Sequence, residues 1–144
     1  LVDHRRQNGT LFCRKRFLHP GDSPQQLPPV WGVALCGTRG WFYEEDREGH
    51  GAKIFNRELI RLEASLKAAG EREKYCFLHY PPLYQGYRCP EIIALLEQYG
   101  VERCYYGHLH GGSHRLAVEG RQGDVAYYLV SADYVGFRPQ KICE

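Results

Sequence analysis

Four short apolar runs are spaced along the chain, and each is bounded by glycine, proline or charged residues. Runs of this length and composition are typical of buried strands. They cover residues 31–36, 75–78, 101–106 and 125–132. Residues 9–18 predict one strand of a hairpin, and the proline-rich stretch 19–30 predicts an irregular loop.

Two segments between the apolar runs carry helix signals. The first is expected to begin at Asn56 as the N-cap, with Glu58 in its first turn and Gly70 as the C′ residue that ends it. The second is expected to begin at Pro90 as the N1 residue and to stop at Gly100. Their apolar positions recur at helical spacing, at Leu59, Leu62, Leu66 and Ala69 and at Ile92, Leu95, Leu96 and Tyr99.

The order strand, helix, strand, helix, strand and further β structure predicts an α/β layered fold, with residues 1–144 as one domain. The formal net charge of +2 is too near balance to favour nucleic acid or an anionic membrane as a partner. No apolar run approaches the ~18–20 residues that span a bilayer. The sequence carries no signal for an oligomeric state.

Cysteine usage bears on the cellular compartment. Three of the six cysteines, Cys36, Cys76 and Cys104, lie inside strand-like runs, and no two cysteines form a C-x-x-C pair. This pattern favours buried free thiols over a disulfide framework or a structural zinc site. We therefore expect a reducing, cytoplasmic compartment.

Three histidines follow predicted strands and are candidate metal ligands. His79 comes directly after one apolar run, and His108 and His110 follow the next one within a glycine-flanked segment. Ligands bind beyond the carboxyl ends of strands in open α/β sheets, and residues i and i+2 of an extended segment project to the same side. The alternatives are a buried structural histidine at His79 and incidental surface histidines at the other two positions.

Three further residues have two possible roles each. Arg39, in a turn between glycines, either contacts a substrate phosphate or stabilises its turn. Asp133 either orients a ligand histidine or has a structural role, in which it pairs with Arg138 or caps a turn. His114 is expected to be exposed or to lie outside the ligand shell.

Several motifs resemble those of calcineurin-like metallophosphoesterases, in particular a bacterial subfamily of predicted phosphohydrolases. The match spans residues 31–142. Residues 106–111, Y-G-H-L-H-G, resemble the G-H-x-H signature, and residues 77–82, F-L-H-Y-P-P, resemble the preceding metal-histidine strand end. Residues 36–41, 56–63, 129–134 and 137–139 are also similar to that subfamily.

The resemblance implies a four-layer α/β/β/α sandwich and a site for two divalent or trivalent ions, such as Mn, Fe or Zn. It implies hydrolysis of phosphomonoesters or phosphodiesters, with His79 and His108 on one ion and His110 on the other. Beyond these metal ligands it assigns no catalytic residue in this chain. Two neighbouring ions activate a water and stabilise charge on the phosphoryl oxygens.

The family's D-x-H, G-D-x-x-D and G-N-H-[DE] motifs have no counterpart in the 144 residues, which also contain no methionine and begin at Leu1. We therefore expect this chain to be the C-terminal part of the domain, with the N-terminal portion missing. Alone it is expected to be inactive, to bind one metal weakly, and to be poorly soluble or to associate. The alternative is a truncated or degenerate relative that keeps the fold as a binding or regulatory domain.

Overall fold

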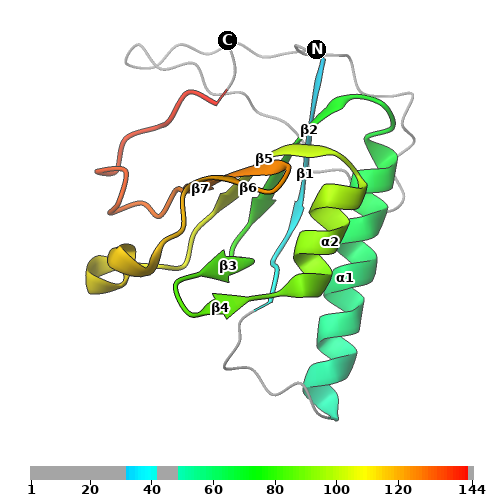
Figure 1. The fold of residues 1–144 in the computed structure, drawn as a ribbon, viewed down its shortest axis with the longest axis horizontal. Coiled ribbons are helices and arrows are strands. Elements are labelled where there is room, and N and C mark those ends of the chain that lie inside the picture. The colour runs from blue at the N-terminus through cyan, green and yellow to red at the C-terminus, as the bar shows by residue number, and fades with distance from the viewer. Residues whose placement is uncertain (1–31, 42–48, 143–144) are drawn as a thin grey trace.

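Strands of the chain form one five-stranded sheet in the structure, a computed structural model that describes residues 32–41 and 49–142. The pairs β1–β2, β2–β5 and β5–β7 are parallel, and β6 is an antiparallel edge strand beside β7 (Figure 1). In their order across the sheet the strands are β1 (Val33–Thr38), β2 (Glu73–Leu78), β5 (Val101–Tyr106), β7 (Val125–Leu129) and β6 (Gly120–Gln122).

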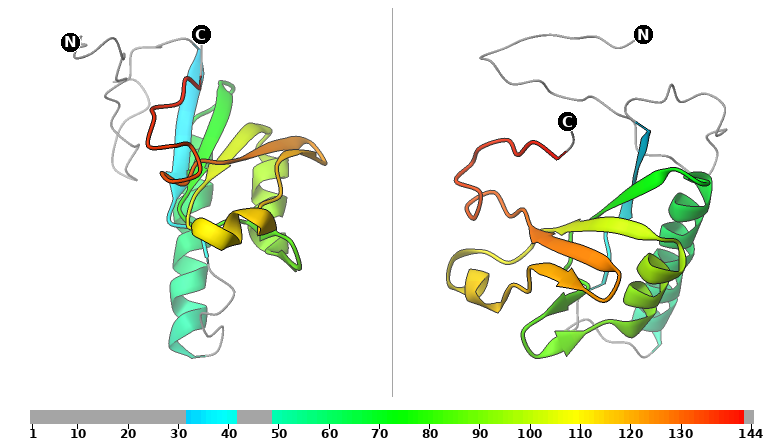
Figure 2. Two further views of the ribbon diagram at one scale, coloured as in Figure 1. Left: turned by 90° about the vertical axis from the view of Figure 1, so that its left-hand side faces the viewer. Right: turned by 45° about the horizontal axis from the view of Figure 1, so that its top comes forward.

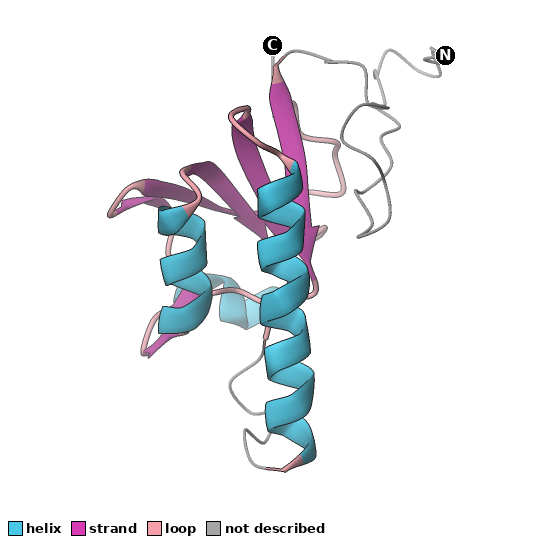
Figure 3. Cartoon of the chain, turned by 90° about the vertical axis from the view of Figure 1, so that its right-hand side faces the viewer, coloured by secondary structure: helices cyan, strands magenta, loops and turns pink. Residues whose placement is uncertain are grey.

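Both long helices lie on the same face of this sheet (Figure 3). They are α1 (His50–Ala68), which joins β1 to β2, and α2 (Pro90–Gln98), which joins β2 to β5. The two crossovers step in one direction across the sheet, and right-handed parallel crossovers then place their helices on one side. The predicted α/β class is confirmed. No helix within the described ranges is long and apolar enough to cross a membrane.

The second helix matches its prediction closely, whereas the first begins earlier than predicted. Pro90 stands at the start of α2, and Gly100 after it has φ +63°. Helix α1 begins at His50 with Gly49 as its N-cap, so Asn56 is not a cap. The helix extends upstream because Phe55 is buried against Trp41, with their ring centroids 5.2 Å apart.

Glu58 therefore does not lie in the first turn of α1, as the sequence predicted, but within the helix. It is 5% exposed, and its carboxylate accepts hydrogen bonds from Thr38 Oγ1 and, at 2.9 Å, from Arg61. A buried carboxylate is stable only when such donors satisfy it. Glu58 thus ties the carboxyl end of β1 to α1 instead of interacting with the helix dipole.

The four strands predicted from the apolar runs 31–36, 75–78, 101–106 and 125–132 all exist, with small differences at their ends. Strand β5 has the predicted bounds. Strand β1 is displaced by two residues toward the C-terminus, and β2 begins two residues earlier than predicted. Strand β7 ends at Leu129, whereas the apolar run continues to residue 132. The predicted hairpin strand 9–18 and loop 19–30 lie outside the described residues.

The helix-covered face of the sheet carries a row of three thiols. The register aligns Cys36 with Cys76 and Cys76 with Cys104, and all three side chains are fully buried. They are free cysteines, as the sequence predicted. Burial raises the pKa of the Cys36 thiol to about 12. The side-chain hydrogen bond with Cys104, together with burial, raises the pKa of Cys76.

Aromatic side chains line the opposite face. Phe77 and Tyr128 stack on the two sides of Tyr105, with ring centroids 4.9 and 5.2 Å from it. Arg103 on the same face hydrogen-bonds the carbonyl of Ile142 at 3.3 Å, which brings the C-terminal segment across this side of the sheet. The alternation of the strand residues thus separates the buried, helix-covered face from a face on which these aromatic rings stack.

The carboxyl ends of the parallel strands meet at one edge of the sheet, and irregular segments gather beyond it. Figure 2 shows a short 3₁₀ helix (Gly111–Leu116) beside the hairpin of β3 (Leu83–Tyr84) and β4 (Tyr87–Arg88). The N–H of Gln85 in the hairpin donates to the carbonyl of Leu116 at 2.7 Å. This edge holds the candidate site.

The packing of α1 gives a matched stability test within one helix. Leu62 is fully buried, whereas Ile60 is 67% exposed. We expect Leu62→Ala to lower the free energy of unfolding by about 2–5 kcal/mol, because it leaves a cavity. Ile60→Ala should change it by no more than about 0.5 kcal/mol. Urea denaturation of both variants measures this, and equal effects would contradict the assigned helix face.

The buried thiols predict low reactivity in the folded chain. A thiol of pKa about 12 is a thiolate in on the order of one molecule in ten thousand at pH 8. We expect iodoacetamide to leave Cys36, Cys76, Cys89 and Cys104 unmodified in buffer and to modify all four in urea, as read by peptide mass spectrometry. Rapid modification of Cys36 under native conditions would refute the packing described.

Candidate metal centre

Backbone hydrogen bonds fix His79 at the carboxyl edge of the sheet. His79 follows β2 directly, and the N–H groups of His79 and Tyr80 both donate to the carbonyl of Arg39, at 3.1 and 2.9 Å. Arg39 itself follows β1, so the ends of the two strands are joined. Gly40 has φ +76°, and a Cβ there would lie 3.0 Å from the carbonyl oxygen of Tyr80, so the junction favours glycine.

His108 has an unusual backbone conformation that aims its ring at His79. The N–H of Gly107 donates to the carbonyl of His79 at 3.2 Å, which joins the end of β5 to that of β2. His108 follows with φ +69°, in the left-handed region that few non-glycine residues adopt. Such conformations cost free energy and gather at functional sites.

The two rings meet in a geometry that fits one metal ion. Nδ1 of His108 lies 3.2 Å from Nε2 of His79. Two imidazole nitrogens bound to one ion at ~2.1 Å, at adjacent coordination positions, lie roughly 3.0–3.4 Å apart. His79 is exposed and His108 half-buried, so the pair is accessible from solvent. Without an ion, the same distance allows a hydrogen bond between the rings.

Tyr80 and Arg39 pack beside this histidine pair. The Tyr80 ring centroid lies 4.6 Å from the ring of each histidine. The guanidinium carbon of Arg39 lies 5.4 Å from the centre of the Tyr80 ring and 6.0 Å from that of Trp41. The Tyr80 ring therefore contacts both histidines and lies next to the guanidinium of Arg39, the candidate phosphate contact.

His110 does not join the pair. Its Nδ1 lies 2.7 Å from Oδ1 of Asp133, and 60% of its side chain is exposed. The i, i+2 argument assumed an extended backbone, and the left-handed conformation at His108 breaks that assumption. Within residues 32–41 and 49–142, no three His, Cys, Asp or Glu side chains are placed to hold one ion together.

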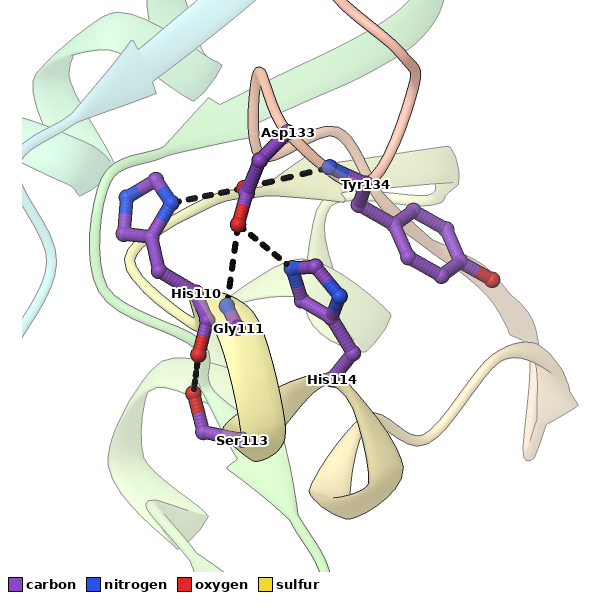
Figure 4. Close-up of polar contacts among 6 residues, drawn as sticks. All are labelled: His110, Gly111, Ser113, His114, Asp133 and Tyr134. Carbon is purple, nitrogen blue, oxygen red and sulfur yellow. Dashed lines mark hydrogen bonds and ion pairs between the residues drawn. The ribbon is translucent and has the colours of Figure 1, made fainter.

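Asp133 is the centre of a second polar cluster (Figure 4). Besides His110, its carboxylate accepts the backbone N–H groups of Gly111 at 2.9 Å and Tyr134 at 3.1 Å. Nε2 of His114, a quarter exposed, lies 3.1 Å from Oδ2, an ion-pair distance without hydrogen-bond geometry. The Gly111 N–H and the two histidines hold the pKa of Asp133 well below its usual range.

The loop that carries Asp133 is itself anchored on both sides. The N–H of Val130 donates to the carbonyl of Tyr106 at 2.8 Å, and the Tyr134 hydroxyl donates to Glu119 at 2.6 Å. The sequence left the role of Asp133 open between orienting a histidine and capping a turn. The one local signal in favour of the first role was its position shortly after the apolar run of β7.

Comparison with known proteins returned no match. No family model matches the chain, and neither curated proteins nor solved structures show significant similarity to it. The functional inference therefore depends on the geometry of the site and on the motifs of the sequence.

The histidine pair predicts capture of a single transition-metal ion. We expect the chain to bind one equivalent of Co²⁺, measured by its visible absorption during a titration. His79→Ala or His108→Ala should weaken binding at least about tenfold, since even an outer-shell partner of a ligand contributes about 10–100-fold.

His114→Ala is the matched control, because it removes a histidine from the same edge whose Nε2 faces Asp133. Its Co²⁺ affinity should equal that of the unaltered chain. An equal loss in all three variants would show that the pair is not the binding site.

Proposed function

We propose that this chain belongs to a metal-dependent phosphate-ester hydrolase of the calcineurin-like metallophosphoesterase type. The observation that carries the proposal is the 3.2 Å approach of His79 Nε2 and His108 Nδ1 beyond the carboxyl edge of a parallel sheet. The two residues come from different strand ends, and the left-handed backbone at His108 directs its ring to the meeting point. A preorganised pair of this kind is what a metal ligand shell requires.

In this proposal His79 and His108 hold one ion and His110 holds a second. Two bound ions of the Mn, Fe or Zn type would supply an activated water and neutralise charge on the phosphoryl oxygens. The hydrogen bonds that the N–H groups of His79 and Tyr80 donate to the carbonyl of Arg39 fix the backbone at His79. The described sheet and helices would form half of the four-layer sandwich, with the aromatic face against the other half.

Arg39 is the proposed contact to the phosphate ester. Its guanidinium is held over Tyr80, which also packs against both histidines of the pair. A planar guanidinium suits two phosphate oxygens, and Arg39 lies exposed at the same edge of the sheet. A phosphate ester is thus the expected ligand, as a monoester or a diester.

Charge balance implies that further ligands are needed for hydrolysis. Neutral imidazoles alone do not balance two divalent ions, and the 144 residues contain no D-x-H or G-N-H motif to supply the bridging carboxylate and the asparagine. We therefore infer that the chain alone is inactive and that a segment carrying those motifs completes the site. The buried free thiols support a cytoplasmic location.

The second candidate is a non-catalytic relative that keeps the fold for binding or regulation. The observation that favours it is that no three His, Cys, Asp or Glu side chains of the described residues are placed to hold one metal ion together. The two candidates differ in one respect, which is whether the missing motifs belong to the same gene product.

The coding region ahead of the Leu1 codon separates the two candidates. If the proposal is right, it reads in frame through D-x-H and G-N-H-[DE], and the longer protein hydrolyses p-nitrophenyl phosphate or bis-p-nitrophenyl phosphate with Mn²⁺. His79→Ala in that protein should lower kcat/KM at least about 100-fold, because it removes a ligand and not only a partner of one.

Arg39→Ala should lower kcat/KM by about 10²–10³, as the loss of one donor to a reacting oxygen does. Arg57→Ala, which removes the same charge from an exposed position on α1, should have no effect. A start codon directly before Leu1, or Mn²⁺-independent turnover, would support the non-catalytic reading or another mechanism instead.

A further inference from the structure

The least expected feature of the site is the number of N–H groups and ring nitrogens that face one carboxylate. His110 Nδ1 and the Tyr134 N–H face Oδ1 of Asp133, and the Gly111 N–H and His114 Nε2 face Oδ2. We propose that Asp133 is a positioning residue for His110, which it holds with the proton on Nδ1 and the lone pair of Nε2 directed away, ready to bind a metal. This inference rests on the proposed function, in which His110 is a ligand.

The argument starts from the chemistry of the carboxylate. An ionised carboxylate has no proton and only accepts hydrogen bonds. Two of its donors, the N–H groups of Gly111 and Tyr134, belong to the backbone, so they fix its orientation independently of any side chain. A ring nitrogen 2.7 Å from such an oxygen must carry the proton.

The tautomer of His110 follows directly. A neutral imidazole has one N–H, and Asp133 places it on Nδ1. Nε2 then carries a lone pair and, in Figure 4, lies on the side of the ring away from Asp133. A metal ligand needs such an unprotonated nitrogen, and a carboxylate on the other ring nitrogen is the usual means of fixing it.

Exposure makes this positioning necessary. The His110 side chain is 60% exposed and has no packed core around it to select one rotamer. The anchor is rigid, because the Asp133 loop is joined to Glu119 through the Tyr134 hydroxyl and to β5 through the Val130 N–H. Asp133 therefore restricts the His110 side chain before an ion binds, so that binding costs less conformational entropy.

The Asp133→Asn variant tests the assignment because an amide changes which atom can donate. If the Asn carbonyl keeps the Gly111 N–H, its NH₂ group faces His110 Nδ1 and favours the proton on Nε2. Asp124→Asn is the matched control, since it removes the same charge from the exposed turn between β6 and β7. The readout is the pair of imidazole ¹⁵N chemical shifts of His110 in the metal-free 144-residue chain at about pH 8, where an ordinary imidazole is neutral.

We expect a protonated Nδ1 and an unprotonated Nε2 in the unaltered chain and in Asp124→Asn, and a shift of the proton toward Nε2 in Asp133→Asn. A proton on Nε2 in the unaltered chain overturns the proposal, and this measurement stands even if a variant fails to fold. An unchanged tautomer in a folded Asp133→Ala variant, which offers His110 Nδ1 no acceptor, overturns it as well.

A metal titration separates failure of this inference from failure of the proposed function. In the longer protein carrying D-x-H and G-N-H, Asp133→Asn should weaken Mn²⁺ binding about 10–100-fold, the range for outer-shell partners. Unchanged Mn²⁺ affinity in that variant overturns the positioning role and leaves the hydrolase standing. Failure of the unaltered longer protein to bind Mn²⁺ refutes the hydrolase, while the tautomer measurement still decides whether Asp133 fixes His110.

Discussion

A short series of backbone hydrogen bonds at the carboxyl edge of the sheet holds the candidate site together. The carbonyl of Arg39 accepts two N–H groups that follow β2, and the carbonyl of His79 accepts the N–H of Gly107 after β5. The ends of β1, β2 and β5 are therefore joined by hydrogen bonds beyond the last paired residues of the sheet. Because these bonds are in the backbone, they position the histidines without any side-chain hydrogen bond.

Close backbone packing and a buried carboxylate support this edge from the sheet beneath it. Gly37, with φ +155°, passes so close to β2 that a Cβ there would lie 2.1 Å from the carbonyl oxygen of Phe77. The buried Glu58 joins α1, the helix that follows β1, to Thr38 at the end of that strand. The left-handed backbone of His108 is tolerated in such a frame, because the surrounding hydrogen bonds leave it no relaxed alternative.

The site has two groups built by different means. The pair His79 and His108 is formed by the strand ends themselves, whereas His110 is oriented from outside by the loop after β7. The left-handed backbone at His108 accounts for this division. It turns the His108 ring toward His79, while His110 faces Asp133. In the proposed hydrolase this separation serves two ions that share a substrate but not a set of histidines.

The sequence alone determined the α/β class, the four strands, the second helix, the buried thiols and the histidines at the strand ends. These signals are local, since an apolar run, Pro90 and Gly100 act within a few residues of the element that they define. Only the tertiary structure decided where α1 begins, what Glu58 binds and that His110 faces Asp133. Those outcomes depend on contacts between residues distant in the chain, such as Glu58 with Thr38 at a separation of 20 residues and His110 with Asp133 at 23. No local pattern encodes these contacts, because the residues that bury or hydrogen-bond one another come together only when the strands pair.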